Sequence, residues 1–456
     1  MGIFHAYDIR GVFGDSLTPA IARRIGNFLP RLLQTREVLV GRDARKSSPI
    51  LFDALCDGLT SAGANVTTIG LCTTPMVYFA SAHYGFDAAV CITASHNPAQ
   101  YNGFKICTTD SRPIGYDTGL GQLEQWVGDI AGEPLTVAAQ PGTIVERDIR
   151  DDYLNFLQPH QSACGELSLA IDCANGMAGL LAEQVFGPAQ QYLFEQIDCS
   201  FPNHPPDPSN PDNLQVLREA VISASHDLGI VFDGDADRVM FLDENGDFVP
   251  PDFIIAVLGK YFHLTGHANP VVLQDVRTSR SVAEFLARFG ATVHTWKVGR
   301  AFAASRLREL DGVVGGELAG HYYFRDFSYS DSAMLAALRV LHVVAHEKRA
   351  GRTFSMLIDE IARYCGSGEI NFTLQNKPAA MAAVRDWFLE HEAPQAIHDF
   401  DGYRLEFPDW WFCIRQSNTE PLLRLVVEAR EQAELTRRID QISTIINQFA
   451  GSQKAA

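Results

Sequence analysis

The sequence contains little that would tie it to a membrane, to an oxidising compartment or to nucleic acid. No apolar run approaches the ~18 residues that a membrane-spanning helix needs, and the first residues do not follow the pattern of a secretion signal. Its nine cysteines include no C-x-x-C pair, and most lie in apolar runs, which is typical of free thiols in a reducing cytosol. We therefore expect a cytoplasmic protein with no membrane partner.

Positive charge is also scarce, since 37 lysines and arginines face 55 aspartates and glutamates and leave a net charge of −18. Such a surface repels nucleic acid, so no nucleic-acid partner is expected. It would also repel a phosphorylated metabolite. A binding site for such an anion would therefore need lysines or arginines gathered locally. The 456 residues, 46% hydrophobic and 20% charged, correspond to a globular protein of about three or four domains.

Segments with strand patterns alternate with helical ones along most of the chain. Strands are expected near residues 38–40, 66–69, 88–92, 167–172, 228–232, 271–273 and 291–296, and helices near 47–62, 252–263 and 279–289, with another helix starting at 176–179. This alternation favours α/β units on mixed, mostly parallel sheets. The last part differs, because acidic and aromatic segments at 400–403, 410–414 and 422–428 alternate with helical patterns at 379–391 and 431–449.

We therefore predict an α/β fold class with four domains. Three related α/β domains would occupy residues 1–147, 148–250 and 251–362, and a smaller α+β domain of antiparallel strands would occupy residues 363–456.

The motif D-G-D-A-D-R at 233–238 directly follows a predicted strand. Asp233, Asp235 and Asp237 would repel one another unless a hard divalent cation bound them through oxygen. A calcium EF-hand is one alternative, because Glu244 has the required offset, but Arg238 stands where that loop needs glycine and the flanks are strand-like. A Mg²⁺ site fits better, and an acidic turn without metal is the remaining interpretation.

The motif T-A-S-H-N-P at 93–98 also follows a predicted strand. A Ser-His-Asp hydrolase would need a G-x-S-x-G elbow, which does not surround Ser95. Two interpretations of this motif remain: Ser95 carries a phosphoryl group, or the segment is a plain polar loop. A phosphoserine would suit the aspartate motif, because Mg²⁺ bound there would neutralise charge during phosphoryl transfer.

Two further loops contain side chains that could bind a phosphate or the hydroxyls of a sugar. R-Q-S-N-T-E-P at 415–421 joins an arginine to short polar side chains, which suits an oxyanion. G-G-E-L-A-G-H at 315–321 places a carboxylate and an imidazole on a glycine turn. Both could instead be ordinary turns. Smaller cationic spots, at 7–11, 42–45, Arg277, Lys297 and Arg300, could offset the acidic exterior at one cleft.

Taken together, these motifs resemble the α-D-phosphohexomutase family. The resemblance is carried, in the family's order and over nearly the whole chain, by Y-D-I-R-G (7–11), T-A-S-H-N-P (93–98), N-G-F-K (102–105), D-G-D-A-D-R (233–238), G-G-E-L-A-G-H (315–321) and R-Q-S-N-T-E-P (415–421). It implies four domains around a central cleft, a Mg²⁺ cofactor, and a hexose 1,6-bisphosphate that serves as intermediate and activator.

The resemblance also implies a role for each site residue. Ser95 would be the phosphoserine and, with Asp233, Asp235 and Asp237, a ligand of Mg²⁺. The transferring phosphoryl group would be surrounded by Arg10, His96, Lys105 and Arg238, with His96 and Lys105 handling protons. The substrate would be bound by Tyr7, Arg277, Arg300, Glu317, His321, Arg415, Ser417, Asn418 and Thr419.

The S-N-T-E-P loop and the string G-G-E-L-A-G-H-Y-Y-F-R-D-F are most similar to bacterial phosphomannomutases. This branch implies interconversion of mannose 1-phosphate and mannose 6-phosphate, with glucose phosphates as further substrates, for GDP-mannose and surface polysaccharide synthesis. A phosphoglucomutase or phosphoglucosamine mutase is the alternative within the family. From other classes, a phosphatase and a non-catalytic protein that binds Ca²⁺ or sugar phosphate stay open. Either a monomer or a homodimer is compatible.

Three positions depart from the family's pattern. Arg277 stands where lysine is common, Ala319 where serine is common, and Arg300 where this branch has a histidine that contacts sugar or phosphate. Arg277 keeps the charge and changes the reach. The departure at Arg300 bears on substrate preference and not on reaction type.

Overall fold

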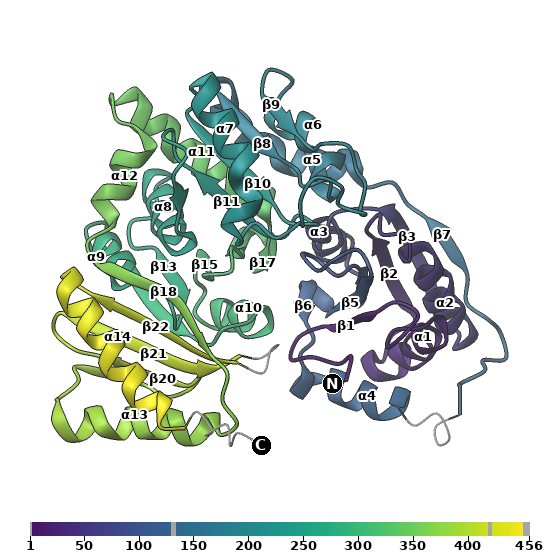
Figure 1. Cartoon of the computed structure of the whole chain (residues 1–456). Coiled ribbons are helices and arrows are strands. Elements are labelled where there is room, and N and C mark those ends of the chain that lie inside the picture. Colours follow the sequence, from purple (N-terminus) through teal and green to yellow (C-terminus); the bar gives the residue numbers. More distant parts are fainter. Residues whose placement is uncertain (1, 129–133, 418–421, 450–456) are drawn as a thin grey trace.

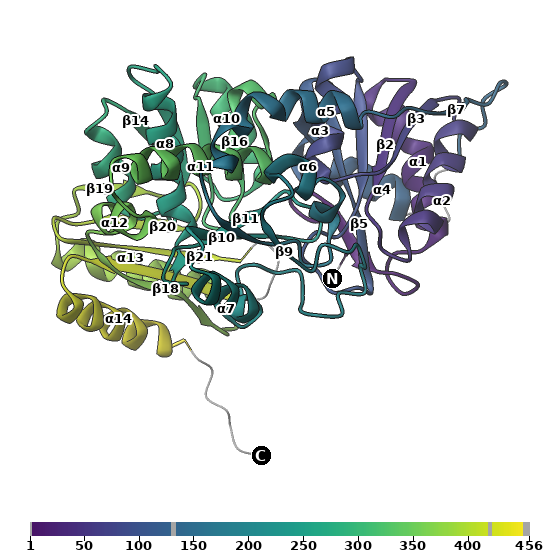
Figure 2. The same cartoon turned by 90° about the horizontal axis from the view of Figure 1, so that it is seen from above.

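A computed structural model describes residues 2–128, 134–417 and 422–449. Four β-sheets, each with its own helices, follow one another along the chain and form an arc from the purple unit to the yellow one (Figures 1 and 2). In the part of the chain that the structure describes, no helix combines the length and apolar character needed to cross a membrane.

The first unit is a seven-stranded sheet in the order β1-β5-β4-β2-β3-β7, with β6 paired to β5. Its elements are β1 (Ile9–Val12), α1 (Pro19–Leu33), β2 (Glu37–Arg42), α2 (Ser48–Ser61), β3 (Asn65–Leu71), α3 (Thr74–Tyr84), β4 (Ala88–Ile92), β5 (Tyr101–Thr108), β6 (Arg112–Pro113), α4 (Leu120–Gly128) and β7 (Ile144–Glu146). Every residue of β4 is buried, as expected for an apolar central strand.

The second and third units each contain a five-stranded sheet, in the orders β12-β11-β10-β8-β9 and β14-β13-β15-β16-β17. The second unit comprises α5 (Arg150–Leu157), β8 (Leu169–Asp172), α6 (Ala182–Phe186), β9 (Gln191–Leu193), α7 (Gln215–Ala224), β10 (Leu228–Phe232), β11 (Val239–Leu242) and β12 (Phe248–Val249). The third comprises α8 (Pro251–Leu264), β13 (Val271–Asp275), α9 (Arg280–Ala287), β14 (Thr292–Trp296), α10 (Arg300–Glu309), β15 (Val314–Gly316), β16 (Tyr322–Phe324), β17 (Ser330–Asp331), α11 (Ala333–Arg349) and α12 (Phe354–Ile361).

The prediction of mixed α/β sheets is confirmed, but antiparallel pairing is more frequent than expected. In the described strands of these three sheets, parallel and antiparallel pairings are equally common. The reason is a recurring hairpin, in which a strand of the parallel part turns back as β4–β5, β10–β11 or β15–β16. The motifs at 93–98, 233–238 and 315–321 lie in or beside the turns of these hairpins.

The fourth unit is an antiparallel sheet in the order β18-β22-β21-β20-β19. Its elements are β18 (Cys365–Phe372), α13 (Lys377–His391), β19 (Ala396–His398), β20 (Tyr403–Glu406), β21 (Trp410–Gln416), β22 (Leu423–Ala429) and α14 (Gln432–Asn447). The predicted α+β character is confirmed. The strand expected at 400–403 begins only at Tyr403, because Gly402 turns the chain at φ 76°. The helix expected from 176 is only a 3₁₀ turn, Met177–Leu180, before α6.

A small buried cluster joins the fourth unit to the third. Its members are Val276, Val298, Trp411, Cys413 and Val426. Beside it, buried Arg404 of β20 lies 3.7 Å from the ring centre of Trp411 and donates to the carbonyl oxygens of Val276 (2.9 Å) and Thr278 (2.7 Å). The two units therefore share apolar and polar contacts. The predicted domain boundaries after residues 147, 250 and 362 stay a prediction.

Candidate active site

Ser95 stands at the end of the buried strand β4 and faces the second unit. Thr93 Oγ1 accepts a hydrogen bond from the Ser95 amide (3.0 Å), and the serine adopts a left-handed φ of 51°. A non-glycine residue in that region is uncommon and often marks a functional constraint. Ser95 is 1% exposed, and its Oγ donates to Asp233 Oδ2 at 2.6 Å. The hydroxyl and the aspartate motif therefore meet, although 138 positions separate them.

The three aspartates of the β10–β11 turn converge around one point. Asp233, Asp235 and Asp237 are fully buried, and each offers a carboxylate oxygen within 4.8 Å of the others. Burial and the two neighbouring carboxylates raise the pKa of Asp233 well above its ordinary value. Within residues 2–128, 134–417 and 422–449, Oδ1 of Asp235 and Oδ1 of Asp237 are buried and find no hydrogen-bond partner. Carboxylate oxygens with free lone pairs suit a hard cation, so the residues present fit Mg²⁺.

Gly234 allows the aspartate loop to approach the serine loop closely. A Cβ at position 234 would lie 2.5 Å from the carbonyl oxygen of Ser95, closer than real Cβ atoms come to other atoms. Glycine at this position therefore lets Asp233 reach the serine hydroxyl.

Two cations lie against the aspartates. Lys105 of β5 contacts Asp237 and donates to Asp235 Oδ2 at 2.7 Å. Burial alone would lower the pKa of Lys105, but the carboxylates of Asp235 and Asp237 outweigh it and raise this pKa above its ordinary value. Nε of Arg238 lies 4.0 Å from Asp233 Oδ2. This acidic site therefore contains its own compensating positive charge, as the overall charge of the chain requires.

His96 and Arg10 border the serine. Nδ1 of His96 lies 3.3 Å from Ser95 Oγ. Burial, followed by the charges of Arg238 and Arg10, lowers the pKa of His96 well below its ordinary value, so the ring is neutral near pH 7. Arg10 donates to Asp8 Oδ2 (2.6 Å) and to the side-chain oxygen of Asn97 in the serine loop.

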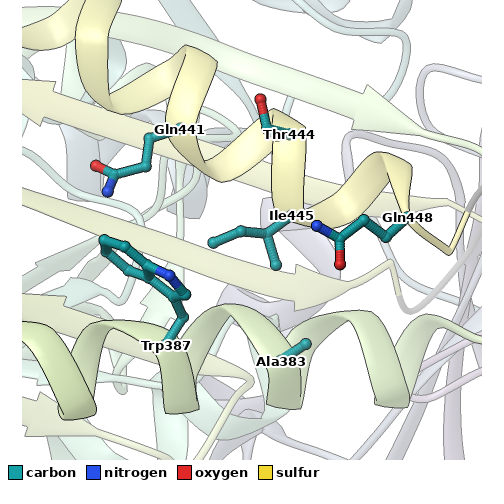
Figure 3. Close-up of a pocket in the computed structure, with 6 residues that line it drawn as sticks. All are labelled: Ala383, Trp387, Gln441, Thr444, Ile445 and Gln448. Carbon is teal, nitrogen blue, oxygen red and sulfur yellow. The ribbon is translucent and has the colours of Figure 1, made fainter.

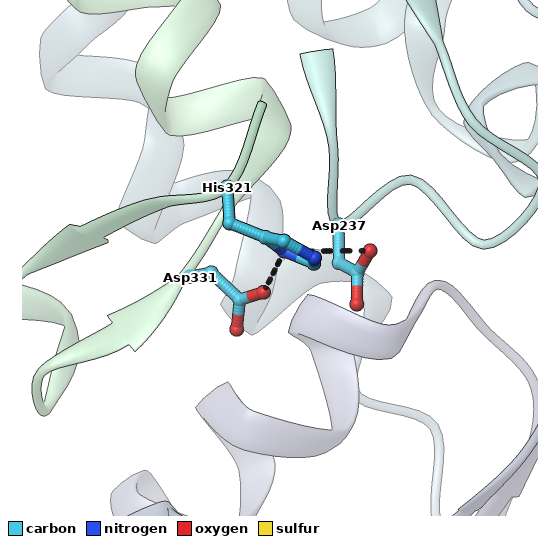
Figure 4. A group of neighbouring side chains, drawn as sticks. All are labelled: Asp237, His321 and Asp331. Atoms are coloured by element: carbon cyan, nitrogen blue, oxygen red, sulfur yellow. Dashed lines mark hydrogen bonds and ion pairs between the residues drawn. The ribbon is translucent and has the colours of Figure 1, made fainter. Parts of the chain in front are cut away.

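His321 connects the 315–321 motif to the aspartates (Figure 4). Its Nδ1 lies 2.6 Å from Asp331 Oδ2 and 3.8 Å from Asp237 Oδ1, while its Nε2 accepts from Arg238 Nε at 2.9 Å. Asp331 also accepts from Arg300 Nε (3.3 Å). Both nitrogens of His321 are therefore engaged next to the aspartate cluster.

Arg300 is buried between two units. It is 6% exposed, and its guanidinium lies 4.0 Å from the ring centre of Tyr78 in α3, while its Nε bonds Asp331 in β17. In this structure, therefore, its contacts are with the protein at the junction of the first and third units.

Glu317 lies within the 315–321 loop of the third unit, and Arg277 follows β13 of the same unit. Glu317 accepts from the hydroxyl of Tyr323 (2.7 Å), and burial raises the pKa of its carboxyl group. Arg277 binds Asp275 through two nitrogens, at 3.1 and 2.8 Å, and Asp275 also accepts from the Leu318 amide (2.7 Å). Asp275 therefore ties the arginine to the loop.

The remaining predicted substrate residues lie in the first and fourth units. A Cβ at Gly299 would lie 3.0 Å from the Tyr7 ring, so Tyr7 reaches the loop before α10. Arg415, at 3% exposure, donates from Nε to Asp401 Oδ1 (3.2 Å), and its Nη2 is buried with no partner among the described residues. Ser417 follows at the end of β21, while Asn418 and Thr419 lie outside the described residues.

Two residues of this constellation were missed by the sequence analysis. Thr74, the first residue of α3, donates from Oγ1 to Asp235 Oδ2 (2.6 Å), and its amide donates to the Asp235 carbonyl oxygen (3.0 Å). Asp331 holds His321. The threonine pair at 73–74 before Pro75 signals a helix start, but nothing in the sequence connects it with residue 235.

The EF-hand alternative is excluded by its twelfth position. Glu244 accepts from the amide (3.1 Å) and the hydroxyl of Ser355, beside α12, and does not complete the aspartate cluster. The flanks of the motif are the strands β10 and β11 rather than helices.

A groove of about 420 Å³ lies away from these residues, between α13 and α14 (Figure 3). It is lined by Ala383, Trp387, Gln441, Thr444, Ile445 and Gln448. None of the predicted site residues that the structure describes lines it, so we do not assign the chemistry to this groove.

Comparison with known proteins connects the site to a family. Four family models match consecutive parts of the chain, described as phosphoglucomutase/phosphomannomutase alpha/beta/alpha domain I (residues 1–125), domain II (151–246), domain III (250–364) and C-terminal domain (369–445).

Individual relatives agree over the full length. A phosphomannomutase of Salmonella montevideo is 36% identical over 97% of this chain and 98% of its own length. A phosphoglucomutase of Neisseria gonorrhoeae is 32% identical, covering 97% of this chain and 96% of its own length. The crystal structure of a phosphoglucomutase/phosphomannomutase family protein from Burkholderia thailandensis superposes with a TM-score of 0.85 at 29% identity, covering 100% and 98% of the two chains.

Proposed function

Because the chain belongs to the phosphoglucomutase/phosphomannomutase family and is therefore a phosphohexomutase, an isomerase that moves phosphate within a sugar, we propose that it interconverts mannose 1-phosphate and mannose 6-phosphate. The observation that carries the proposal is the 2.6 Å hydrogen bond between Ser95 Oγ and Asp233, which joins a candidate phosphoryl carrier to a cluster fit for a divalent cation.

Ser95 would carry the phosphoryl group. The bond from phosphorus to Ser95 Oγ breaks as the bond to the free hydroxyl of the hexose monophosphate forms, which gives a hexose 1,6-bisphosphate. Neutral His96 suits the acceptance of the hydroxyl proton, and charged Lys105 suits the return of a proton to Ser95 Oγ. After the bisphosphate turns over, the opposite phosphate returns to the serine.

Asp233, Asp235 and Asp237, with the phosphate on Ser95, would hold Mg²⁺. When bound, this ion supplies charge neutralisation for the transferring phosphoryl group. Arg238 and Lys105 contribute positive charge at the same place, because both already lie against the carboxylates. Arg10 would complete the cationic surroundings from the first unit.

The substrate would span the first, third and fourth units. Glu317 and His321 are proposed to bind sugar hydroxyls, and Tyr7, Arg277 and Arg300 to line that part of the site. The phosphate that does not react would be held by Arg415, Ser417, Asn418 and Thr419. The buried Nη2 of Arg415 has no acceptor in the part of the chain that the structure describes, which supports this assignment, because such a guanidinium nitrogen suits an anionic ligand.

Mannose is favoured over other hexoses by the S-N-T-E-P loop and by relatives named phosphomannomutase. The relative named phosphoglucomutase makes glucose phosphates the second substrate to test. Purified protein with mannose 1-phosphate, Mg²⁺ and a trace of hexose 1,6-bisphosphate should form mannose 6-phosphate. Absence of turnover with mannose, glucose and glucosamine phosphates would refute the proposal, and release of inorganic phosphate instead of isomerised sugar would identify a phosphatase.

The carrier assignment has its own test. Ser95→Ala should abolish turnover and the single added phosphate expected in the intact mass. Ser223→Ala on the exposed face of α7 is the matched control, because the one hydrogen bond of Ser223 Oγ among the described residues is to the carbonyl oxygen of Ala220 in its own helix. A Ser95 variant with the wild-type rate would assign the phosphoryl carrier elsewhere.

A further inference from the structure

Arg45 is a buried cation that the proposed mechanism does not use. It lies on the loop between β2 and α2 and is only 1% exposed. The sequence groups it with cations that could face an anionic substrate. Its contacts are instead with the protein, and they centre on the backbone of the loop that carries Ser95.

All five N–H groups of this guanidinium have an acceptor. Nη2 donates to the carbonyl oxygens of Ser95 (2.8 Å) and Asn97 (2.7 Å), and Nη1 to those of Pro98 (2.7 Å) and Tyr101 (3.1 Å). Nε donates to Asp43 Oδ2 at 3.1 Å. Three carbonyl oxygens of the loop and one from the first residue of β5 therefore accept from a single side chain, and only arginine supplies five donors in a planar fork.

Asp43 fixes the arginine in turn. Its Oδ1 accepts from the Arg45 amide (3.0 Å) and from the hydroxyl of Ser48, the first residue of α2. Asp43 is 2% exposed. The guanidinium is thus anchored to the start of a helix, on a rigid element beneath the serine loop.

The position of Ser95 depends on a backbone conformation that costs energy. Its φ of 51° is unfavourable for a residue with a Cβ, and such strain persists only where the surroundings hold it. The carbonyl oxygen of Ser95 is one of the four acceptors, and it also packs against Gly234 of the aspartate loop. The same guanidinium thus holds the loop from beneath while the serine hydroxyl faces Asp233.

We infer that Arg45 is a positioning residue that holds the Ser95 loop in its strained conformation, so that the serine oxygen faces the aspartate cluster, and that it does not bind the sugar phosphate. The inference rests on the proposed function, since it takes Ser95 as the phosphoryl carrier. It predicts that a change at Arg45 affects the chemical step and leaves substrate binding largely unaltered.

Arg45→Lys is the principal test, because lysine keeps the charge but has three donors and no fork. Displacing the nucleophile by about 1 Å typically costs about 100-fold in rate, so kcat should fall by about that factor with little change in KM. Lys46→Ala is the matched control, because Lys46 is the exposed neighbour of Arg45. Its kcat should equal that of the wild type.

Arg45→Ala supplies the second readout. Free guanidinium or ethylguanidinium at millimolar concentration should restore part of its kcat and should leave Arg45→Lys and the Lys46 control unaffected. A thermal melt of each variant reports whether it is folded. Rescue of a folded variant would support positioning by the guanidinium itself.

Four results would overturn the inference: a folded Arg45→Lys enzyme with wild-type kcat, an increase in KM with unchanged kcat, no rescue of a folded Arg45→Ala variant, or failure of both variants to fold. Absence of rescue would show that the missing guanidinium donors do not cause the defect, and failure of both variants to fold would make Arg45 a general stability residue. Wild-type protein assayed in parallel separates the two hypotheses, because its inactivity on all three hexose phosphates would refute the proposed function, whatever the variants do.

Discussion

Gly234→Ala tests how closely the serine loop and the aspartate loop must approach each other. The added Cβ would lie 2.5 Å from the carbonyl oxygen of Ser95, whereas ordinary contacts begin at 3.4 Å, so the two loops would have to separate by about 0.9 Å. The neighbour that must move is the backbone carbonyl oxygen of Ser95, which also accepts a hydrogen bond from the Arg45 guanidinium. The backbone at Gly234 does not have a positive φ, so the effect of the methyl group is steric alone.

A displacement of this size should lower kcat by about 100-fold, because a nucleophile misplaced by about 1 Å loses about that factor. The assay is steady-state turnover of mannose 1-phosphate, with a thermal melt to show that the variant is folded. Gly165→Ala is the matched control, since a Cβ there meets nothing within 4 Å, and it should retain the wild-type kcat. A folded Gly234→Ala enzyme with the kcat of that control would refute the claim that the two loops act at this distance.

Three further changes probe the surroundings of the site. Asp331→Asn turns one acceptor of the carboxylate into a donor facing His321 or Arg300, so kcat should fall by about 100-fold without loss of fold; an unaltered kcat would contradict this. Arg404→Met leaves two buried carbonyl oxygens without a donor and should lower the free energy of unfolding by about 2–5 kcal/mol. Chemical denaturation measures this difference, and a variant as stable as the wild type would contradict the prediction. Burial raises the pKa of Glu406, but interaction with a neighbouring histidine and two arginines outweighs it and lowers the pKa to about 2. This carboxylate therefore stabilises the fold above its unfolded pKa of about 4.5, and the stabilisation is lost as the pH falls toward 2. Glu406→Gln should thus melt earlier than wild type at pH 7, with a gap that narrows below pH 4.5; a gap independent of pH would disprove the linkage.

The sequence predicts those parts of the fold whose signal is local. β4 and β10 agree with prediction to the residue, because each is a short apolar run that ends at a polar motif. The aspartate motif predicts its metal-binding character by itself, since three carboxylates at alternating positions repel one another in any fold. The share of antiparallel strands was harder to predict, because a hairpin and a crossover connection can begin with the same strand.

The contacts of residues outside the family motifs could not be predicted. Thr74 reaches Asp235 across 161 positions, and no property of either segment encodes that pairing. Arg45 has the composition of a surface cation, but its five acceptors are mostly backbone oxygens, which carry no side-chain signal. Arg300 was expected to bind substrate, and its partner Asp331 lies in a segment without a motif. The roles of these residues depend on tertiary packing rather than on local pattern.

The cluster between the third and fourth units contains a cysteine, Cys413, whose rate of alkylation would report separation of the two units. The Cys413 thiol is 1% exposed, and burial raises its pKa to about 12, so alkylating reagents cannot reach a thiolate while the units stay packed. If the fourth unit moved away from the third, the Cys413 sulfur would lose this packing and react faster, whereas partly buried Cys365 in β18 would report the background rate of alkylation. Following carbamidomethylation of the two peptides by mass spectrometry, with and without sugar phosphate, would time this separation without introducing any label.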